Sequence, residues 1–168
     1  KDSRFMPSGM NLHYIDNTDP DTMSQLLTQL PLADTFFLAV SKSGNTVETM
    51  VQFMLVLEAL QDKGMAIKEH CLAVTMPGER ALRKLSEAHQ IHIMDHDGEM
   101  GGRFSVLSLV GLLPAAAAGL NVRALRAGAK DIMQQCWDTP EKSAPALGAA
   151  LQVAAMQKGK NISVLMPY

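Results

Sequence analysis

Short apolar runs alternate along the chain with longer stretches of helical periodicity, and this alternation predicts the fold. Strand-like runs, most of them almost continuously apolar as in parallel strands covered on both faces, occupy residues 11–16, 35–41, 70–76, 91–95 and 162–168. Helical patterns occupy residues 20–30, 46–62, 79–89, 104–120, 122–136 and 145–159. Strands that alternate with helices predict an α/β domain with a doubly wound parallel sheet of roughly five strands and helices on both faces.

Local signals predict several helix ends. Asp19 before Pro20 is typical of a helix start, and Gly64 is typical of a helix stop. Asn45 followed three residues later by Glu48 fits a capping box at the start of the helix over 46–62. Pro114 is expected to kink or divide the helix over 104–120.

Composition bounds the class of protein. The chain has 168 residues, 47% of them hydrophobic, and a formal charge of -2, which offers no bulk attraction for nucleic acid or an anionic membrane. We therefore expect neither partner. The apolar run 106–120 is interrupted and short for a membrane span. Cys71 and Cys136 are typical of reduced thiols in a cytoplasmic protein, and residues 1–9 lack a signal-peptide pattern.

The two ends of the sequence suggest a longer parent chain. The first residue is not Met, and the last run, ISVLMPY, is strand-like with nothing after it to complete the fold. We expect the 168 residues to be part of something longer, and we treat them as one domain.

The stretch SKSGNTVET, residues 41–49, carries more polar side chains than a turn after a strand requires. A loop that opens a helix exposes unpaired N–H groups at the positive end of the helix dipole, which favours an anion. Gly44 permits close backbone approach, Lys42 adds charge, and hydroxyl donors come from Ser41, Ser43 and Thr46. The order of residues fits neither a Walker A loop nor a dinucleotide fingerprint, so a monophosphate suits it better. A plain hydrogen-bonded turn with a helix cap stays open as the alternative.

A second polar loop precedes the apolar helix over 104–120. Gly101 and Gly102 come directly before Arg103, whose guanidinium could pair with phosphate or stabilise negative charge on a substrate oxygen. The alternative is a structural arginine tied to Asp97 or Glu99. Because ligands bind at the carboxyl ends of strands in such sheets, two such loops at one edge favour a site. His92 and His96 are too far apart along a strand to suggest a metal site.

These motifs resemble a known family. SKSGNTVET matches the S-x-S-G-x-T-x-E phosphate loop of the sugar isomerase (SIS) fold, a flavodoxin-like arrangement. Lys42 in that loop, GGRFSVLSLVGL at 101–112, IDNTDP at 15–20 and GKNISVLMPY at 159–168 are similar to the glucose-6-phosphate isomerase family, over essentially the whole chain. The resemblance implies one SIS domain over residues 1–168, and a sugar phosphate as the small-molecule partner.

The resemblance also implies roles. The family interconverts glucose 6-phosphate and fructose 6-phosphate in glycolysis and gluconeogenesis through an enediolate, without metal or organic cofactor. Arg103 and the Gly102 backbone would stabilise the enediolate, and the phosphate would be held by Ser41, Lys42, Ser43 and Thr46. Glu48 would cap its helix. The family is normally a homodimer.

Several family features are absent from these residues, namely the G-I-G-G-S loop, the glutamate base, the ring-opening histidine and a C-terminal lysine. We therefore expect the chain to bind sugar phosphate weakly and to turn over nothing by itself. A non-catalytic SIS sensor of sugar phosphates and a sibling isomerase for another sugar phosphate remain alternatives. Arg103 separates the first of them, because a sensor needs the anion loop and not an enediolate-stabilising arginine.

Overall fold

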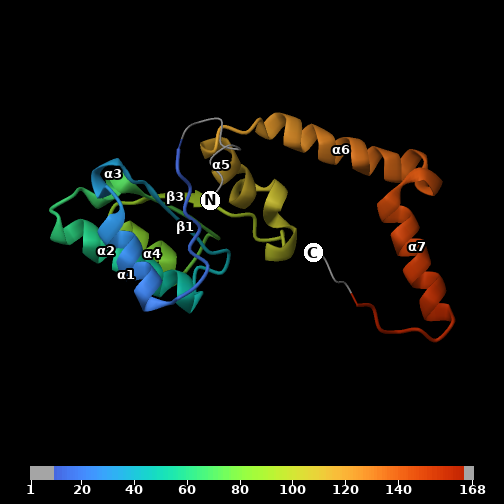
Figure 1. Ribbon diagram of the computed structural model, residues 1–168, viewed down its shortest axis with the longest axis horizontal. Coiled ribbons are helices and arrows are strands. Elements are labelled where there is room, and N and C mark those ends of the chain that lie inside the picture. The colour runs from blue at the N-terminus through green and yellow to red at the C-terminus, as the bar shows by residue number, and fades with distance from the viewer. Residues whose placement is uncertain (1–9, 165–168) are drawn as a thin grey trace. The chain divides into compact units, whose positions relative to one another are not determined.

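The computed structural model describes residues 10–164, which fall into two compact units, Lys1–Leu120 (unit 1) and Asn121–Tyr168 (unit 2) (Figure 1). Each unit is described by itself. Unit 1 is an α/β unit that contains every described strand, whereas the described part of unit 2 is helical.

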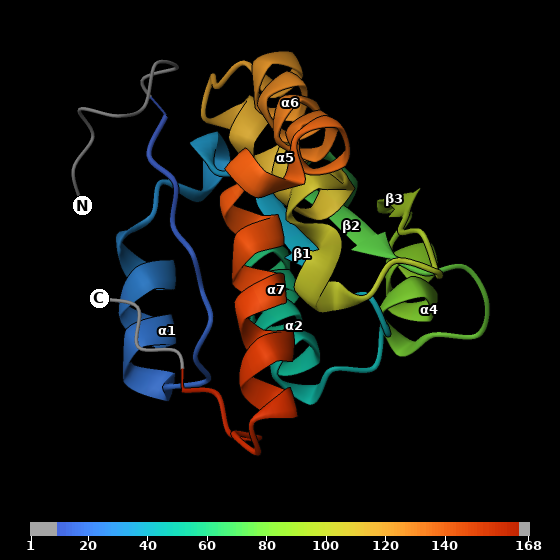
Figure 2. The same cartoon turned by 90° about the vertical axis from the view of Figure 1, so that its right-hand side faces the viewer.

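Three parallel strands form the sheet of unit 1. They are β1 (Phe37–Val40), β2 (Cys71–Thr75) and β3 (His92–Asp95), in the order β1-β2-β3, and they follow one another across the unit in Figure 2. The register pairs Phe37 with Cys71, and Leu72 with His92. The strands predicted over 35–41, 70–76 and 91–95 are therefore confirmed.

The strand predicted over 11–16 is wrong, because residues 10–19 adopt no strand. Ile15 packs against the core, but Tyr14 is 65% exposed, so the run lacks the continuous burial that a strand in this sheet requires. The carbonyl of Asn17 instead accepts a hydrogen bond from Gln52 Nε2 at 2.8 Å. Of the strand predicted over 162–168, residues 162–164 lie outside any strand and residues 165–168 lie outside the described part.

The helices of unit 1 follow the predicted pattern with one addition. They are α1 (Pro20–Gln29), α2 (Val47–Asp62), α3 (Ile67–His70) and α4 (Ala81–Ala88), with the short 3-10 turn η2 (Leu32–Asp34). Asp19 caps α1 by accepting from the N–H of Thr22 at 3.0 Å and from its hydroxyl, and these bonds lower the pKa of the Asp19 carboxyl. Gly64, at φ +65°, ends α2 as expected. The short helix α3 was not predicted.

The main buried cluster lies on one face of the sheet, and Val74 of β2, on the opposite face, is fully buried as well. The strands contribute Phe37, Ala39, Cys71 and Ala73 to the main cluster, and these share one face by alternation. The covering helices contribute Met23, Phe53, Val56, Leu57, Leu60 and Leu82. Right-handed crossovers between neighbouring parallel strands explain why α2 and α4 cover the same face. A firm sheet thus supports the loops at its carboxyl edge.

The helix predicted over 104–120 is divided, but not where the sequence suggested. A 3-10 helix, η3 (Gly102–Leu107), precedes α5 (Leu109–Ala117), and the break is at Ser108 rather than at Pro114, which lies inside α5. Ser108 is extended, with φ -97° and ψ -171°, and its hydroxyl accepts from the N–H of Val110. Gly111 fits because a Cβ there would lie 2.1 Å from the Val106 carbonyl oxygen.

Unit 2 contains α6 (Val122–Asp138), the 3-10 turn η4 (Pro140–Lys142) and α7 (Ala144–Gln157). Asn121 caps α6 by accepting from the N–H of Ala124 at 3.0 Å. Within residues 10–164, no helix has the length and apolar character needed to cross a membrane.

Candidate functional site

Three polar connections meet at one edge of the sheet, because parallel strands present their carboxyl ends together. They are residues 41–46 after β1, 76–80 after β2 and 96–103 after β3. The central position of β2 places its connection between the other two. Residues 17–19 do not belong to this set, since no strand precedes them.

The loop over 41–46, called the anion loop below, is shaped by its own hydroxyl groups. Ser41 is only 6% exposed, and its Oγ accepts from the N–H of Gly44 at 3.1 Å. The Thr46 hydroxyl lies 2.9 Å from Ser41 Oγ and 3.3 Å from Ser43 Oγ. Three of the four predicted phosphate ligands therefore converge on one point at the start of α2.

The N-terminus of α2 carries no side-chain cap. Thr46 is the capping residue, but no side chain bonds to the first-turn N–H groups, so the predicted capping box of Asn45 and Glu48 is wrong. Asn45 Oδ1 instead accepts from the N–H of Ala81 in α4 at 3.0 Å. The free donors and the helix dipole of a 16-residue helix leave this end suited to an anion.

The anion loop is bonded along its length to the connection that follows β2 and to the start of α4. The N–H of Met76 donates to the Lys42 carbonyl at 3.1 Å, and the N–H of Leu82 donates to the Gly44 carbonyl at 2.8 Å. Gly44 has φ +66°, and a Cβ there would lie 2.6 Å from Thr75 Oγ1. The loop is therefore held in one conformation by its neighbours.

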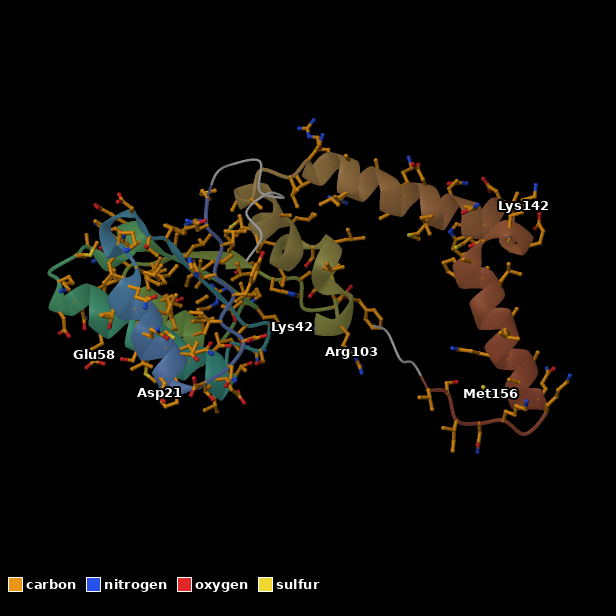
Figure 3. All side chains as sticks on the ribbon, viewed as in Figure 1. Asp21, Lys42, Glu58, Arg103, Lys142 and Met156 are labelled. Atoms are coloured by element: carbon orange, nitrogen blue, oxygen red, sulfur yellow. The ribbon has the colours of Figure 1, made fainter. Side chains whose placement is uncertain are left out.

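Lys42 and Arg103 are the two cations that the sequence predicts for the site. Figure 3 labels both on the same side of unit 1. Lys42 is half-buried and Arg103 is exposed. The ion pairs among residues 10–164 are Arg83 with Asp95 and Lys84 with Glu79, so neither Lys42 nor Arg103 is neutralised by a described carboxylate.

The second loop leaves Arg103 unattached. Gly101 precedes η3, and Gly102 and Arg103 are exposed in its first turn. Asp97 Oδ1 accepts from the N–H of Glu99 at 2.9 Å, which forms the turn without the arginine. The alternative of a structural arginine tied to Asp97 or Glu99 does not appear among the described contacts.

Other chemically capable side chains lie apart from these loops or are buried. Cys71, the first residue of β2, is buried at 2% exposure. Desolvation raises the pKa of its thiol to about 12, which keeps it protonated. His96 is 3% exposed, with Nδ1 2.7 Å from the Asp97 carbonyl oxygen. No group of metal-ligating side chains occurs within residues 10–164.

A hollow of about 680 Å³ lies away from the candidate site. It is lined by the end of α1, by η2 and by the end of α2, with Leu27, Leu32, Asp62 and Met65 among its residues. None of the residues that line it belongs to the three connections at the carboxyl edge of the sheet. The candidate site at the carboxyl edge of the sheet is therefore separate from this hollow.

Sequence reasoning misassigned one residue in the anion loop and missed another beside it. Asn45 was assigned to the wrong helix, and Arg80, whose Cβ lies 2.7 Å from the position of a Gly44 Cβ, was not considered. A local signal did exist, since a Pro-Gly pair before a helix marks a turn at the end of a strand.

Comparison with known proteins gives consistent matches. The sequence profile of the phosphoglucose isomerase family matches residues 3–168. A glucose-6-phosphate isomerase of Carboxydothermus hydrogenoformans is 37% identical over 99% of this chain and 36% of its own length. A probable glucose-6-phosphate isomerase of Methanococcus maripaludis is 34% identical over 94% of this chain and 36% of its own length.

Solved structures agree with the sequence matches. A hypothetical protein from Thermus thermophilus has a TM-score of 0.83 at 35% identity, covering 92% of this chain and 38% of that one. A glucose-6-phosphate isomerase from Chlamydia trachomatis has a TM-score of 0.67 at 30% identity, covering 84% of this chain and 27% of that one. The chain thus spans about 36% of the length of the curated relatives described above.

Proposed function

The chain belongs to the phosphoglucose isomerase family, and from this premise we propose that it is the sugar-phosphate-binding part of an aldose-ketose isomerase. The proposed reaction is the reversible conversion of glucose 6-phosphate into fructose 6-phosphate, and the name glucose-6-phosphate isomerase of its relatives supports it. The residues 1–168 act as one SIS domain, and a homodimer is the working assembly. A doubly wound sheet with a second layer of helices is part of the same proposal.

In this proposal the anion loop binds the substrate phosphate. Its donors are the uncapped N–H groups of α2 together with the exposed hydroxyls of Ser43 and Thr46, and Lys42 supplies the charge. Ser41 contributes indirectly, because its buried hydroxyl is hydrogen-bonded to the Thr46 hydroxyl and to the N–H of Gly44 and so orients both. The uncapped start of α2 beneath three clustered hydroxyls is the single observation that carries the proposal.

Arg103 acts in the chemical step rather than in phosphate binding. Moving a proton between C2 and C1 of the open-chain sugar places negative charge on the substrate oxygens of an enediolate. An exposed guanidinium with no carboxylate partner, beside the free backbone of Gly102, can stabilise that charge as it develops. The base that moves the proton comes from outside these 168 residues.

Titration with glucose 6-phosphate, followed through backbone amide resonances, tests whether the anion loop binds the phosphate. We expect the largest shifts over residues 41–48, and no comparable shifts with uncharged glucose, because the phosphate is the group that the loop recognises. Shifts confined to residues away from the anion loop would contradict the proposal. An isomerase assay of the same chain should show no turnover, and robust turnover would contradict an external base.

The sensor alternative predicts a different effect of Arg103. In the full-length protein, Arg103→Ala should strongly lower turnover and barely change the affinity for sugar phosphate if the residue stabilises the enediolate. A protein that never shows isomerase activity, yet still binds glucose 6-phosphate through Lys42, would be the sensor. A sibling isomerase would show turnover with another sugar phosphate and none with glucose 6-phosphate.

A further inference from the structure

Arg80 lies against the anion loop from a neighbouring element. It is the last residue before α4, within the connection that follows β2. Its Cβ and Cγ lie 2.7 and 3.3 Å from the position that a Cβ on Gly44 would occupy. The aliphatic part of the side chain therefore covers the glycine at the centre of the anion loop.

The Arg80 side chain has a buried donor with no acceptor. Its Nε atom is fully shielded from solvent and makes no hydrogen bond. Leaving a buried donor unpaired normally costs about 1–3 kcal/mol, and more for a charged group, so most such donors have partners. An acceptor that completes this site is expected from a ligand.

Neighbouring cations show what a structural role looks like on the same helix. Arg83 donates from Nε to the Met76 carbonyl at 3.2 Å and pairs with Asp95. Lys84 pairs with Glu79. Within residues 10–164, Arg80 has no such carboxylate, although Arg83 and Lys84 further along the chain each have one. Arg80 is thus a cation beside the anion loop that no described carboxylate neutralises, as is Lys42 within the loop.

We propose that Arg80 is an additional binding residue for the substrate phosphate, reaching the anion loop from the central connection of the sheet. The proposal rests on the function proposed above and deepens it. Lys42 approaches the phosphate from the loop itself. Arg80 approaches over Gly44, and on binding its guanidinium turns so that the Nε, shielded in the ligand-free protein, donates to a phosphate oxygen. Asn45 helps to fix this arrangement, because its bond to the N–H of Ala81 holds the residue after Arg80 against the loop.

The opposing interpretation makes Arg80 a structural side chain that covers Gly44 without contacting ligand. The two differ in the protein without ligand. A structural arginine stabilises the fold, so its removal lowers the melting temperature. An arginine that waits for a phosphate carries an unpaired buried donor, so its removal leaves the melting temperature of the ligand-free protein unchanged or raises it.

The test uses the full 168-residue chain, with inorganic phosphate as the probe. We expect Arg80→Ala to weaken phosphate binding about tenfold, the loss typical of one charge-assisted hydrogen bond. The Tm without phosphate should not fall, and the increase in Tm caused by phosphate should shrink. Arg126→Ala, which removes the same charge from an exposed position on α6, is the matched control and should leave binding unchanged. Arg80→Lys, which keeps the charge without the Nε donor, should recover only part of the affinity.

Two outcomes separate this inference from the proposed function. If Lys42→Ala loses phosphate binding while Arg80→Ala keeps full affinity, Arg80 is not a ligand and the anion loop still is. If neither substitution changes phosphate binding, the proposed function fails together with this inference. A lower Tm for Arg80→Ala with unchanged affinity assigns the residue to structure and overturns the proposal.

Discussion

Two loops at the same edge of the sheet carry the proposed site, and they are built in opposite ways. The anion loop is hydrogen-bonded to its neighbours at Lys42, Gly44 and Asn45, and its first residue, Ser41, is buried. The loop that carries Arg103 makes its turn through Asp97 and leaves the guanidinium exposed. A group that binds the unreacting phosphate gains from a fixed shape, because no ordering is then required on binding. A group that stabilises charge formed during the reaction acts only once the substrate is in place.

The largest effect is expected from the exposed loop. In the full-length protein, Arg103→Ala should lower kcat about 10²–10³-fold and change KM little, because one stabilising donor is lost in the transition state and not in the ground state. Steady-state kinetics on fructose 6-phosphate measure both constants. Arg126→Ala is the control for charge. An increase in KM at constant kcat would show that Arg103 contributes to substrate binding. The two loops would then not differ in function.

The glycines of the two loops should differ in what they tolerate. Gly44→Ala should lower the free energy of unfolding by about 2 kcal/mol, because the new Cβ meets Thr75 and Arg80 in a left-handed backbone. Gly102→Ala meets nothing within 4 Å, so its stability should change by less than about 0.5 kcal/mol. Urea unfolding of the two variants measures the difference. Equal losses would show that the loops are equally constrained.

Lys42 should contribute to binding and not to folding. We expect Lys42→Ala to weaken the binding of glucose 6-phosphate about tenfold with an unchanged melting temperature, since no described carboxylate depends on it. Isothermal titration calorimetry and thermal unfolding give the two quantities. A fall in melting temperature with normal affinity would make Lys42 structural.

The smallest effect is expected at Asn45. Asn45→Ala should lower the free energy of unfolding by about 1 kcal/mol, because the N–H of Ala81 loses its acceptor at the start of α4. Asn45→Asp keeps the acceptor and should keep most of the stability. Hydrogen exchange at Ala81 reports the bond directly, and protection that survives in Asn45→Ala would contradict the assignment.

Sequence reasoning succeeded where the signal is local. The three apolar runs before the loops became β1, β2 and β3, and the glycine and hydroxyl residues of the anion loop stand where the pattern placed them. A continuous apolar run needs no partner to be recognised as a buried strand. The same reasoning placed Arg103 after the third strand of the sheet.

Sequence reasoning failed where a residue's contact partner lies far along the chain. Asn45 has the spacing of a capping box with Glu48, but its amide bonds to Ala81, 36 residues away. The run over 11–16 has strand-like composition, yet it forms no strand. Ile15 packs against the core, and the carbonyl of the following Asn17 accepts a bond from Gln52 in α2. The unpaired donor of Arg80 has no sequence signature, because it is defined by contacts that are missing.

A crystal structure of the chain with glucose 6-phosphate tests the central claim, that the anion loop is a preformed phosphate site. The phosphate is expected within hydrogen-bond distance of Ser43 Oγ, Thr46 Oγ1 and Lys42 Nζ, at the start of α2. The bonds from Met76 to Lys42 and from Leu82 to Gly44 should be unchanged. A phosphate bound elsewhere, or an anion loop that must break those bonds to receive it, would contradict the account.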